Sequence, residues 1–147
     1  MVINVTVRLY YEAKCPHCKF LDKYILEPIC ESLGITYVKR ECDTIAFHDK
    51  YTQLMLDLAE GRAKILDFEL KEKPSSFVMN ILKRSVDVPV VEIEIATETH
   101  IHRIYIIGMV DERRQDLIRM VRANLLSYLT QLKRLEESSI REALRGG

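Results

Sequence analysis

Two cysteines separated by two residues, Cys15 and Cys18, are the residues of this sequence best suited to chemistry. A pair of thiols at this spacing can cycle between a dithiol and a disulfide, and so exchange two electrons with another disulfide. The pair follows a segment rich in β-branched and aromatic residues, 2–11, and precedes apolar residues at helical spacing. The sequence therefore predicts that Cys15 lies where a strand passes into a helix.

The start of a helix favours a thiolate over a thiol. The first turn has N–H groups without intrahelical partners and the positive end of the helix dipole, and cysteines in such places have pKa values of roughly 3.5 to 7.5 instead of about 8.5. Lys14, His17 and Lys19 add cationic or partly cationic groups around the pair. We therefore expect Cys15 to be the nucleophile and Cys18, one helical turn further on, to be the resolving thiol.

Composition limits the classes of protein to which the chain can belong. Its 147 residues are 48% hydrophobic and 30% charged, which excludes a disordered chain and fits a single domain over 1–147. The 22 Lys and Arg residues balance 22 Asp and Glu residues, so no overall field attracts nucleic acid or an anionic membrane. No apolar run approaches the roughly 18 residues of a membrane span. We expect neither nucleic acid nor a membrane as a partner.

The N-terminal residues and the number of cysteines indicate a cytoplasmic protein. The chain begins without the cationic segment, apolar stretch and cleavage site of a secretory signal. Four cysteines are far fewer than a secreted disulfide scaffold of this size carries, and cytosolic cysteines are more often catalytic or metal-binding. Three Asn and three Gln are few beside so many charged residues, a bias typical of thermophile proteins.

Apolar periodicity predicts an α/β fold whose first half is a strand, a helix and a second strand. The helix is expected over 16–33, where Gly34 is a natural stop. Pro28 should kink or loosen its later turns, because proline has no N–H to donate. A short strand is expected over 35–40.

The second half of the chain is predicted to hold helices, a hairpin and a long helix. Apolar residues in 43–86, among them Ile65 and Leu66, fit two or three helices. Strands over 88–95 and 101–107 are separated by a short polar link, which favours their pairing as a hairpin. Glu92 and Glu94 should lie on the polar face of the first of these strands. Asp111 can cap the long helix.

The C-terminal helix is expected to run to about Glu137 and to end near Ser138 and Ser139, with 140–145 a frayed turn or a short extra helix. Its apolar stripe has 3,4,3,4,3 spacing and is longer than a small sheet needs. The stripe consists of Ile118, Val121, Leu125, Tyr128, Leu132 and Leu135. It could fold back on the helices of 43–86 or pair with a second copy in a homodimer, and the intramolecular arrangement is the one favoured.

These elements, with Cys15-Pro16-His17-Cys18 and with Val88-Pro89 before the hairpin, resemble the thioredoxin superfamily over most of the chain. The resemblance implies a central mixed sheet of about four strands flanked by helices, with extra helices between 43 and 86. It also implies a thiol–disulfide oxidoreductase that acts on disulfide-containing proteins or small thiols. A reductase or oxidase must recycle the pair, and no cofactor is expected because the cysteines carry the electrons.

The tetrapeptide resembles that of the oxidising, DsbA-type members of the superfamily, whereas the length and Val88-Pro89 resemble glutaredoxins equally well. The resemblance implies that Pro89 is cis and lies across from the cysteines, and that Val88 offers backbone groups to an extended substrate. Thioredoxins proper carry a buried acid six places before the first cysteine. Leu9 occupies that place, and Glu12 is the nearest acid.

The charges around the pair also predict its redox direction. Whatever stabilises the thiolate stabilises the dithiol form and raises the reduction potential, by 30 mV for about each 1.4 kcal/mol. His17 and the two lysines beside the pair therefore predict a relatively oxidising couple, with a potential above the value of about −270 mV found for thioredoxin.

Two other functions are compatible with the same cysteines. One is a thioredoxin-like binding module without enzymatic activity, in which the pair is a redox-dependent switch. The other is a zinc site in which Cys42 and His48 complete four ligands with the pair, an arrangement that their spacing makes weak.

The remaining candidates have simpler interpretations. Cys30 and Cys42 could pair, but buried free thiols are the favoured interpretation. His100 and His102 would share one side of a strand, yet two histidines without a third ligand make a poor metal site, so we expect none there. Tyr10 and Tyr11 are expected to pack in the core rather than to line a substrate groove.

Overall fold

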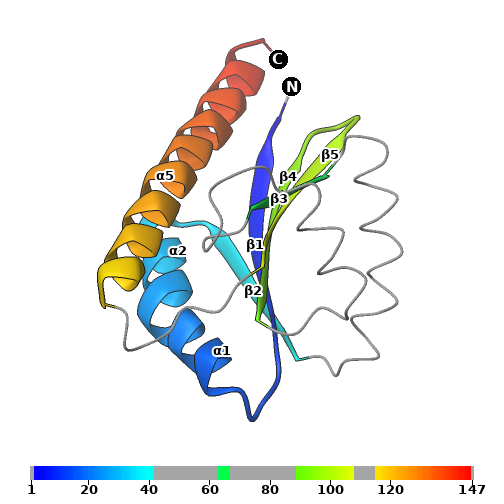
Figure 1. Ribbon diagram of the computed structural model, residues 1–147. Helices are drawn as coiled ribbons and strands as arrows, with labels where there is room; N and C mark the ends of the chain where they lie inside the picture. Colours follow the sequence, from blue (N-terminus) through cyan, green and yellow to red (C-terminus); the bar gives the residue numbers. More distant parts are fainter. Residues whose placement is uncertain (1, 42–62, 67–88, 108–114, 147) are drawn as a thin grey trace.

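The computed structural model describes residues 2–41, 63–66, 89–107 and 115–146, which form a sheet with helices packed on it (Figure 1). In chain order the elements are β1 (Asn4–Tyr11), α1 (Pro16–Leu21), the π-helical turn η1 (Asp22–Leu26), α2 (Glu27–Leu33), β2 (Thr36–Glu41), β3 (Ala63–Leu66), β4 (Val90–Ala96), β5 (Ile101–Ile107) and α5 (Gln115–Gly146). The α/β class is confirmed. Among the helices in these ranges, none is both long and apolar enough to cross a bilayer.

The strands form one mixed sheet in the order β2-β1-β4-β5-β3. β1 pairs with β2 in parallel, as a strand–helix–strand unit requires, and with β4 in antiparallel fashion. β4 and β5 are antiparallel neighbours joined by a short link, so the predicted hairpin is confirmed. The sheet has five strands rather than about four, because β3 pairs in parallel with β5.

β3 corrects the prediction of helix at Ile65 and Leu66. Residues 63–66 form a strand opposite residues 103–106 of β5. A short apolar run has no clear period, so pairing with the free side of β5 decides its conformation. The rest of the predicted helices between 43 and 86, and Asp111, lie outside the described residues.

A single helical segment follows β1, and its middle turn is widened. The N–H of Glu27 bonds to the carbonyl of Asp22, five residues earlier, whereas in an α-helix it would bond to the carbonyl four residues earlier. Pro28 follows immediately, and a proline both lacks an N–H and crowds the carbonyl four residues before it. The helix is therefore loosened in the turn that precedes Pro28, whereas the later turns, where the loosening was predicted, form the regular helix α2. Gly34 ends the segment with a left-handed φ of 68°.

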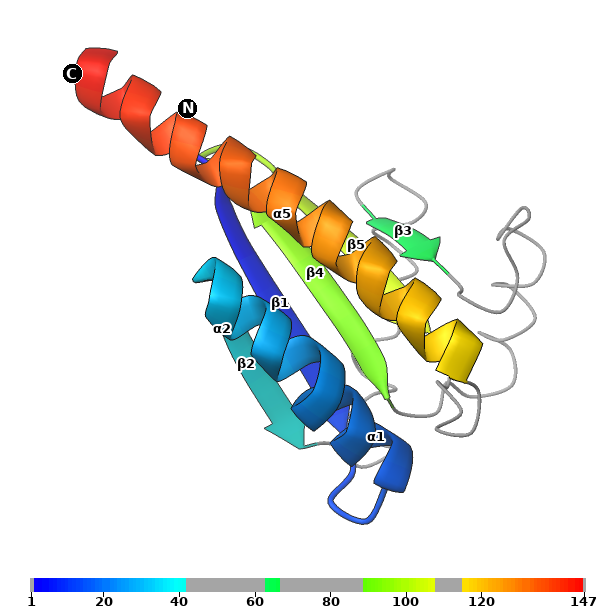
Figure 2. The ribbon, with the colours of Figure 1, turned by 90° about the vertical axis from the view of Figure 1, so that its left-hand side faces the viewer.

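The helices α1, α2 and α5 lie on the same face of the sheet, and Figure 2 shows α2 and α5 side by side in front of β1 and β4. The odd residues of β1, Val5, Val7 and Leu9, point into the layer between sheet and helices and are almost fully buried. Ile25 and Leu26 of η1 pack into the same core. This core fixes the angle at which the helical segment leaves β1.

The apolar face of α5 packs on α2 and β1. Its buried members are Ile118, Val121, Leu125, Leu129 and Leu132. Their 3,4,4,3 spacing follows the period of a straight α-helix, whereas a strict heptad would have used Tyr128 and Leu135. Tyr128 is half-buried, and Leu135 is 55% exposed. The helix thus serves the core of its own chain, through α2 and the sheet.

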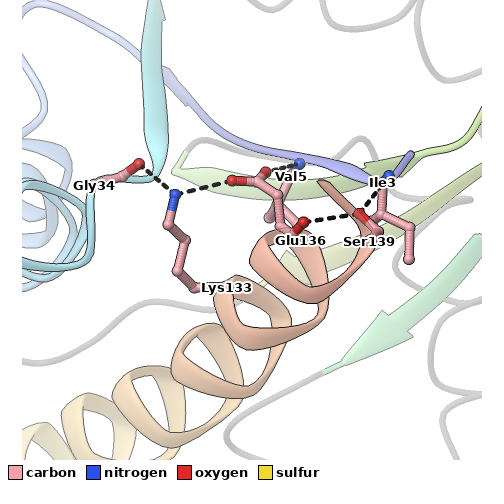
Figure 3. A network of polar contacts seen from close by, with 6 residues as sticks. All are labelled: Ile3, Val5, Gly34, Lys133, Glu136 and Ser139. Carbon is pink, nitrogen blue, oxygen red and sulfur yellow. Dashed lines mark hydrogen bonds and ion pairs between the residues drawn. The ribbon is translucent and has the colours of Figure 1, made fainter. Parts of the chain in front are cut away.

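The prediction that α5 ends near Ser138 and Ser139 is wrong, because the helix continues to Gly146. Ser139 is buried, and its hydroxyl donates to the carbonyl of Glu136 and accepts the N–H of Ile3 (Figure 3). The carboxylate of Glu136 accepts the N–H of Val5 at 2.7 Å. β2 pairs with β1 only from Thr6 onward, so these two side chains take the N–H groups that β2 leaves without a strand partner.

Lys133 extends this network to the end of α2. Its ammonium group lies 2.9 Å from Glu136 and donates to the carbonyl of Gly34 at 3.1 Å (Figure 3). A cation next to the C-terminal carbonyls of a helix is favourable. Ser139 and Glu136 thus hold α5 to Ile3 and to Val5 of β1, and Lys133 holds it to the end of α2.

Glu92 and Glu94 lie on the opposite face of the sheet from Val91 and Ile93, as predicted, and Glu92 is buried there. Glu92 is 4% exposed, and Arg8 donates to it at 2.9 Å and also to Glu94. Tyr10 and Tyr105 both hydrogen-bond to Glu92, and burial together with this carboxylate raises the pKa of each phenol. The charge is therefore paired and hydrogen-bonded, as burial demands.

Candidate functional site

A tight turn carries the chain from β1 to the helical segment. The N–H of Cys15 bonds to the carbonyl of Glu12 at 3.1 Å, which closes the turn over residues 12–15. Pro16 is the first residue of α1, where its fixed φ suits the helix and its missing N–H costs nothing. Cys15 is consequently the N-cap of α1. The predicted strand-to-helix junction is confirmed.

Cys15 lies at this junction with its sulfur facing the first turn. The Sγ accepts the backbone N–H of Cys18 at 3.2 Å, and the side chain is neither buried nor fully exposed. An N–H donor and the positive end of the helix both interact more favourably with a sulfur anion than with a neutral thiol. Cys15 is therefore accessible to a second molecule and has surroundings that stabilise negative charge.

Cys18 has the opposite surroundings. Its side chain is 1% exposed. Burial raises the pKa of the Cys18 thiol to about 12, with a further contribution from a hydrogen bond to the Cys15 side chain, while a backbone hydrogen bond from Glu12 acts in the other direction. The two thiols are thus neighbours with unequal roles: one is reachable, and the other is covered and holds its proton.

His17 lies between the two cysteines in sequence and is half-buried. Its Nδ1 is buried and has no hydrogen-bond partner within the described ranges. Lys14 and Lys19 are exposed to solvent on either side of the pair. Glu12 is exposed as well, and its charge adds to the rise in the pKa of Cys18.

Pro89 is buried and immediately precedes β4. Val90, the next residue, pairs with Tyr10 near the end of β1. This register places Pro89 at the end of the sheet from which the turn to Cys15 leaves. Val88, the other predicted substrate-binding residue, lies outside the described residues.

A cavity of about 100 Å³ lies beside the dithiol, and Cys18 lines it. Leu9 and Tyr11 of β1, Asp22 of η1 and Lys39 of β2 form other parts of its wall. Tyr10 is buried and Tyr11 is half-buried against the core, as expected, and Tyr11 also lines this cavity.

Asp22 is the residue at this cavity that the sequence analysis missed. Its Oδ1 accepts the hydroxyl of Tyr37 at 2.8 Å, and its Oδ2 lies 3.3 Å from the ammonium of Lys39. Asp22 is 8% exposed, and its backbone N–H bonds to the carbonyl of Cys18, so the two residues lie one helical turn apart. The sequence did contain a signal: Cys18 and Asp22 are four residues apart in a predicted helix, and residues at this spacing are neighbours on a helix surface.

The residues considered as metal ligands do not gather around the dithiol within the described ranges. No group of three or more His, Cys, Asp or Glu residues there has the arrangement of a metal site. His100 and His102 stack with their ring centroids 6.5 Å apart on the exposed β4–β5 hairpin. Cys42 and His48 lie outside the described residues.

Cys30 is a buried free thiol of α2, as expected. Burial raises its pKa to about 11, so near neutral pH it is protonated and unreactive. Cys30 therefore differs in reactivity from Cys15, whose side chain is partly accessible.

Comparisons with protein-family models, with curated proteins and with solved structures found no match to this chain. The arguments that follow therefore rest on the residues and their geometry.

Proposed function

We propose that this protein is a thiol–disulfide oxidoreductase with a thioredoxin-like core, and that Cys15 and Cys18 are its redox-active pair. The order of the described elements supports the resemblance: a strand, the Cys-Pro-His-Cys turn, a helical segment, a parallel strand, and later a hairpin followed by a C-terminal helix. β3 is an addition at the edge of the sheet.

The observation that carries the proposal is the contact between the N–H of Cys18 and the sulfur of Cys15 at 3.2 Å. It combines, at one strand-to-helix junction, a partly accessible sulfur that accepts a backbone N–H and a buried thiol close enough to hydrogen-bond to that sulfur. A structural pair of cysteines has no need of this difference in exposure.

The proposed reaction has two exchange steps. The Cys15 thiolate attacks one sulfur of a substrate disulfide, which forms a mixed disulfide and releases the other substrate sulfur as a thiolate. Cys18 then loses its proton and attacks the sulfur of Cys15, which forms the Cys15–Cys18 disulfide and releases the second substrate thiolate. Two electrons leave the dithiol and reduce the substrate, and the reverse sequence oxidises a substrate dithiol.

Substrates in this proposal are disulfides of proteins or of small thiols, and a separate reductase or oxidase restores the pair. Pro89 and Val88 are assigned to substrate binding, which the position of Pro89 at the cysteine end of the sheet supports. The cationic surroundings of the pair support an oxidising direction. No cofactor takes part, and a cytoplasmic location agrees with reactive rather than structural cysteines.

Trapping of the mixed disulfide tests the proposal. A Cys18→Ser variant, exposed to a protein disulfide or to glutathione disulfide, should accumulate a covalent adduct at Cys15 that dithiothreitol releases. Cys15→Ser should form no such adduct, and Cys30→Ser is the matched control, which should react like the unaltered protein. A binding module would trap nothing through Cys15. A zinc protein would contain stoichiometric metal and have no reactive thiol until the metal is removed.

A further inference from the structure

The second exchange step raises a problem of proton transfer. Cys18 must become a nucleophile, yet its thiol is 1% exposed and bonded toward Cys15. A thiol with a pKa near 12 is ionised to about one part in 10⁵ at pH 7, so a step that waits for spontaneous ionisation would be slow. A base within reach of Cys18 would remove this obstacle.

The acid that thioredoxins proper carry six places before the first cysteine is absent here, because Leu9 occupies that place. Leu9 is 1% exposed and lines the cavity beside Cys18 from the β1 side. Asp22 lines the same cavity from the helical side. A carboxylate therefore reaches this cavity from the helix although the strand supplies none.

We propose that Asp22 is the proton acceptor for Cys18, working through water in the cavity that both residues line. This inference rests on the proposed function and assigns the proton of its second step. The cavity of about 100 Å³ has room for a few water molecules, and the carboxylate, Lys39 and Tyr37 offer polar partners nearby.

The neighbours of Asp22 suit this role. Tyr37 donates to one carboxylate oxygen, and the ammonium of Lys39, which also lines the cavity, lies 3.3 Å from the other, so both oxygens are held in place. Lys39 has a side chain 41% exposed, so it links the cavity to bulk solvent. Tyr11 and Lys19 are the other titratable groups on the cavity wall.

The step balances as follows. The proton of the Cys18 thiol passes through water to the Asp22 carboxylate while the Cys18 sulfur attacks the Cys15 sulfur. The bond between Cys15 and the substrate breaks, the intramolecular disulfide forms, and the substrate leaves as a thiolate. Asp22 then releases the proton to solvent. In the reverse direction the Asp22 carboxyl returns a proton to the departing Cys18 thiolate.

Rapid mixing of the reduced protein with glutathione disulfide separates the two steps. Samples quenched in acid are analysed by mass spectrometry for the Cys15–glutathione adduct and for the Cys15–Cys18 disulfide. Asp22→Asn should form the adduct at the unaltered rate, but convert it to the intramolecular disulfide at least tenfold more slowly at pH 7. Glu31→Gln, which removes an exposed negative charge from the same helical segment, is the matched control and should change neither rate.

The pH profile of the second step distinguishes a proton acceptor from a structural role. If Asp22 accepts the proton, the unaltered protein should resolve the adduct at a nearly constant rate between pH 6 and 8. Asp22→Asn should instead show a rate that rises about tenfold per pH unit, because only prior ionisation of Cys18 then supplies the nucleophile.

Either of two results would overturn the inference: resolution by Asp22→Asn at the unaltered rate, or a tenfold rise per pH unit in the unaltered protein. The second needs no variant, so it decides the question even if Asp22→Asn does not fold. Absence of any adduct at Cys15 would remove the proposed function itself and this inference with it, whereas normal adduct formation with unchanged resolution removes the inference alone.

Discussion

The backbone N–H of Cys18 points at the sulfur of Cys15 across 3.2 Å, although the side chains of the two residues differ sharply in exposure. In the first turn of α1, the Cys15 sulfur therefore has a hydrogen-bond donor and access to solvent, whereas the Cys18 sulfur is covered. The asymmetry follows from the turn over residues 12–15 and from Pro16, which begin the helix at Cys15. The redox pair and the packing of the helices that hold it in place lead to four testable predictions.

His17 should raise the reduction potential of the pair. A positive charge between the two cysteines favours the thiolate, hence the dithiol form, and an imidazole at position 17 is the side chain there that can carry one. We expect a potential above about −270 mV for the unaltered protein, and a potential at least about 30 mV lower for His17→Ala, equivalent to about 1.4 kcal/mol. Equilibration in glutathione redox buffers followed by thiol alkylation measures both. His100→Ala, on the exposed hairpin, is the control. An equal or higher potential for His17→Ala would refute this contribution.

Cys30 should make the fold sensitive to alkali. Its folded pKa of about 11 lies above the value of about 8.5 to 9 in an unfolded chain, so folding favours the protonated thiol. Its contribution to stability is complete below about pH 8.5 and is lost as the pH rises toward 11. Between pH 7 and pH 10 this loss amounts to about 1 to 2 kcal/mol.

The Cys30→Ala variant isolates that contribution, because the tyrosines and Cys18 titrate in both proteins. At pH 7 the variant should be about 1 kcal/mol less stable, since it loses a small buried side chain. At pH 10 this difference should disappear or reverse. Urea unfolding under reducing conditions at both pH values measures it, and an identical difference at the two pH values would show that the thiol of Cys30 is not shielded as described.

Glu136 should anchor α5 to the sheet. Glu136→Ala leaves the N–H of Val5 without its partner in a partly buried place and removes a contact of Lys133, so we expect a loss of about 1 to 3 kcal/mol in the free energy of unfolding. Glu136→Gln keeps an acceptor for Val5 and should lose less. The exposed neighbour Glu137 provides the control, Glu137→Ala, with a change within about 0.5 kcal/mol. Equal effects at the two positions would contradict the role given to Glu136.

Much of the fold could be predicted because local patterns and tertiary packing agree. The alternation in β1, the helical spacing after Cys18 and the stop at Gly34 each indicate an element that the structure contains. β5 has the predicted bounds, and the hairpin link lies where polar residues interrupt two apolar strands. In these segments the same residues that favour the local structure also fill the core.

The parts that could not be predicted depend on contacts between distant segments. Residues 63–66 have a pattern too short to distinguish helix from strand. Only their pairing with β5 decides between the two conformations. Ser139 was predicted to mark a helix end, yet its hydroxyl accepts the N–H of Ile3, just before β1, and the helix continues. The alternation of β4 gives the face on which Glu92 lies, but its burial depends on Arg8 of β1 and on two tyrosines.

The candidate site divides in the same way. The positions of Cys15 and Cys18 could be read from their spacing and from the elements around them, because the chemistry is local to one turn. Asp22 was missed because its significance depends on β2, which brings Tyr37 and Lys39 to the helix, and on the cavity that it shares with Cys18.

The rate of alkylation of Cys15 as a function of pH tests the central claim most directly. Reduced protein is treated with iodoacetamide between pH 5 and 9, and the labelled position is identified by mass spectrometry. The account predicts that Cys15 is labelled first and still reacts readily at pH 6, where an ordinary thiol is almost entirely protonated, while Cys18 and Cys30 stay unlabelled in the folded chain. A rate at Cys15 that falls tenfold per pH unit below about 8.5, like that of a cysteine in a free peptide, would contradict it.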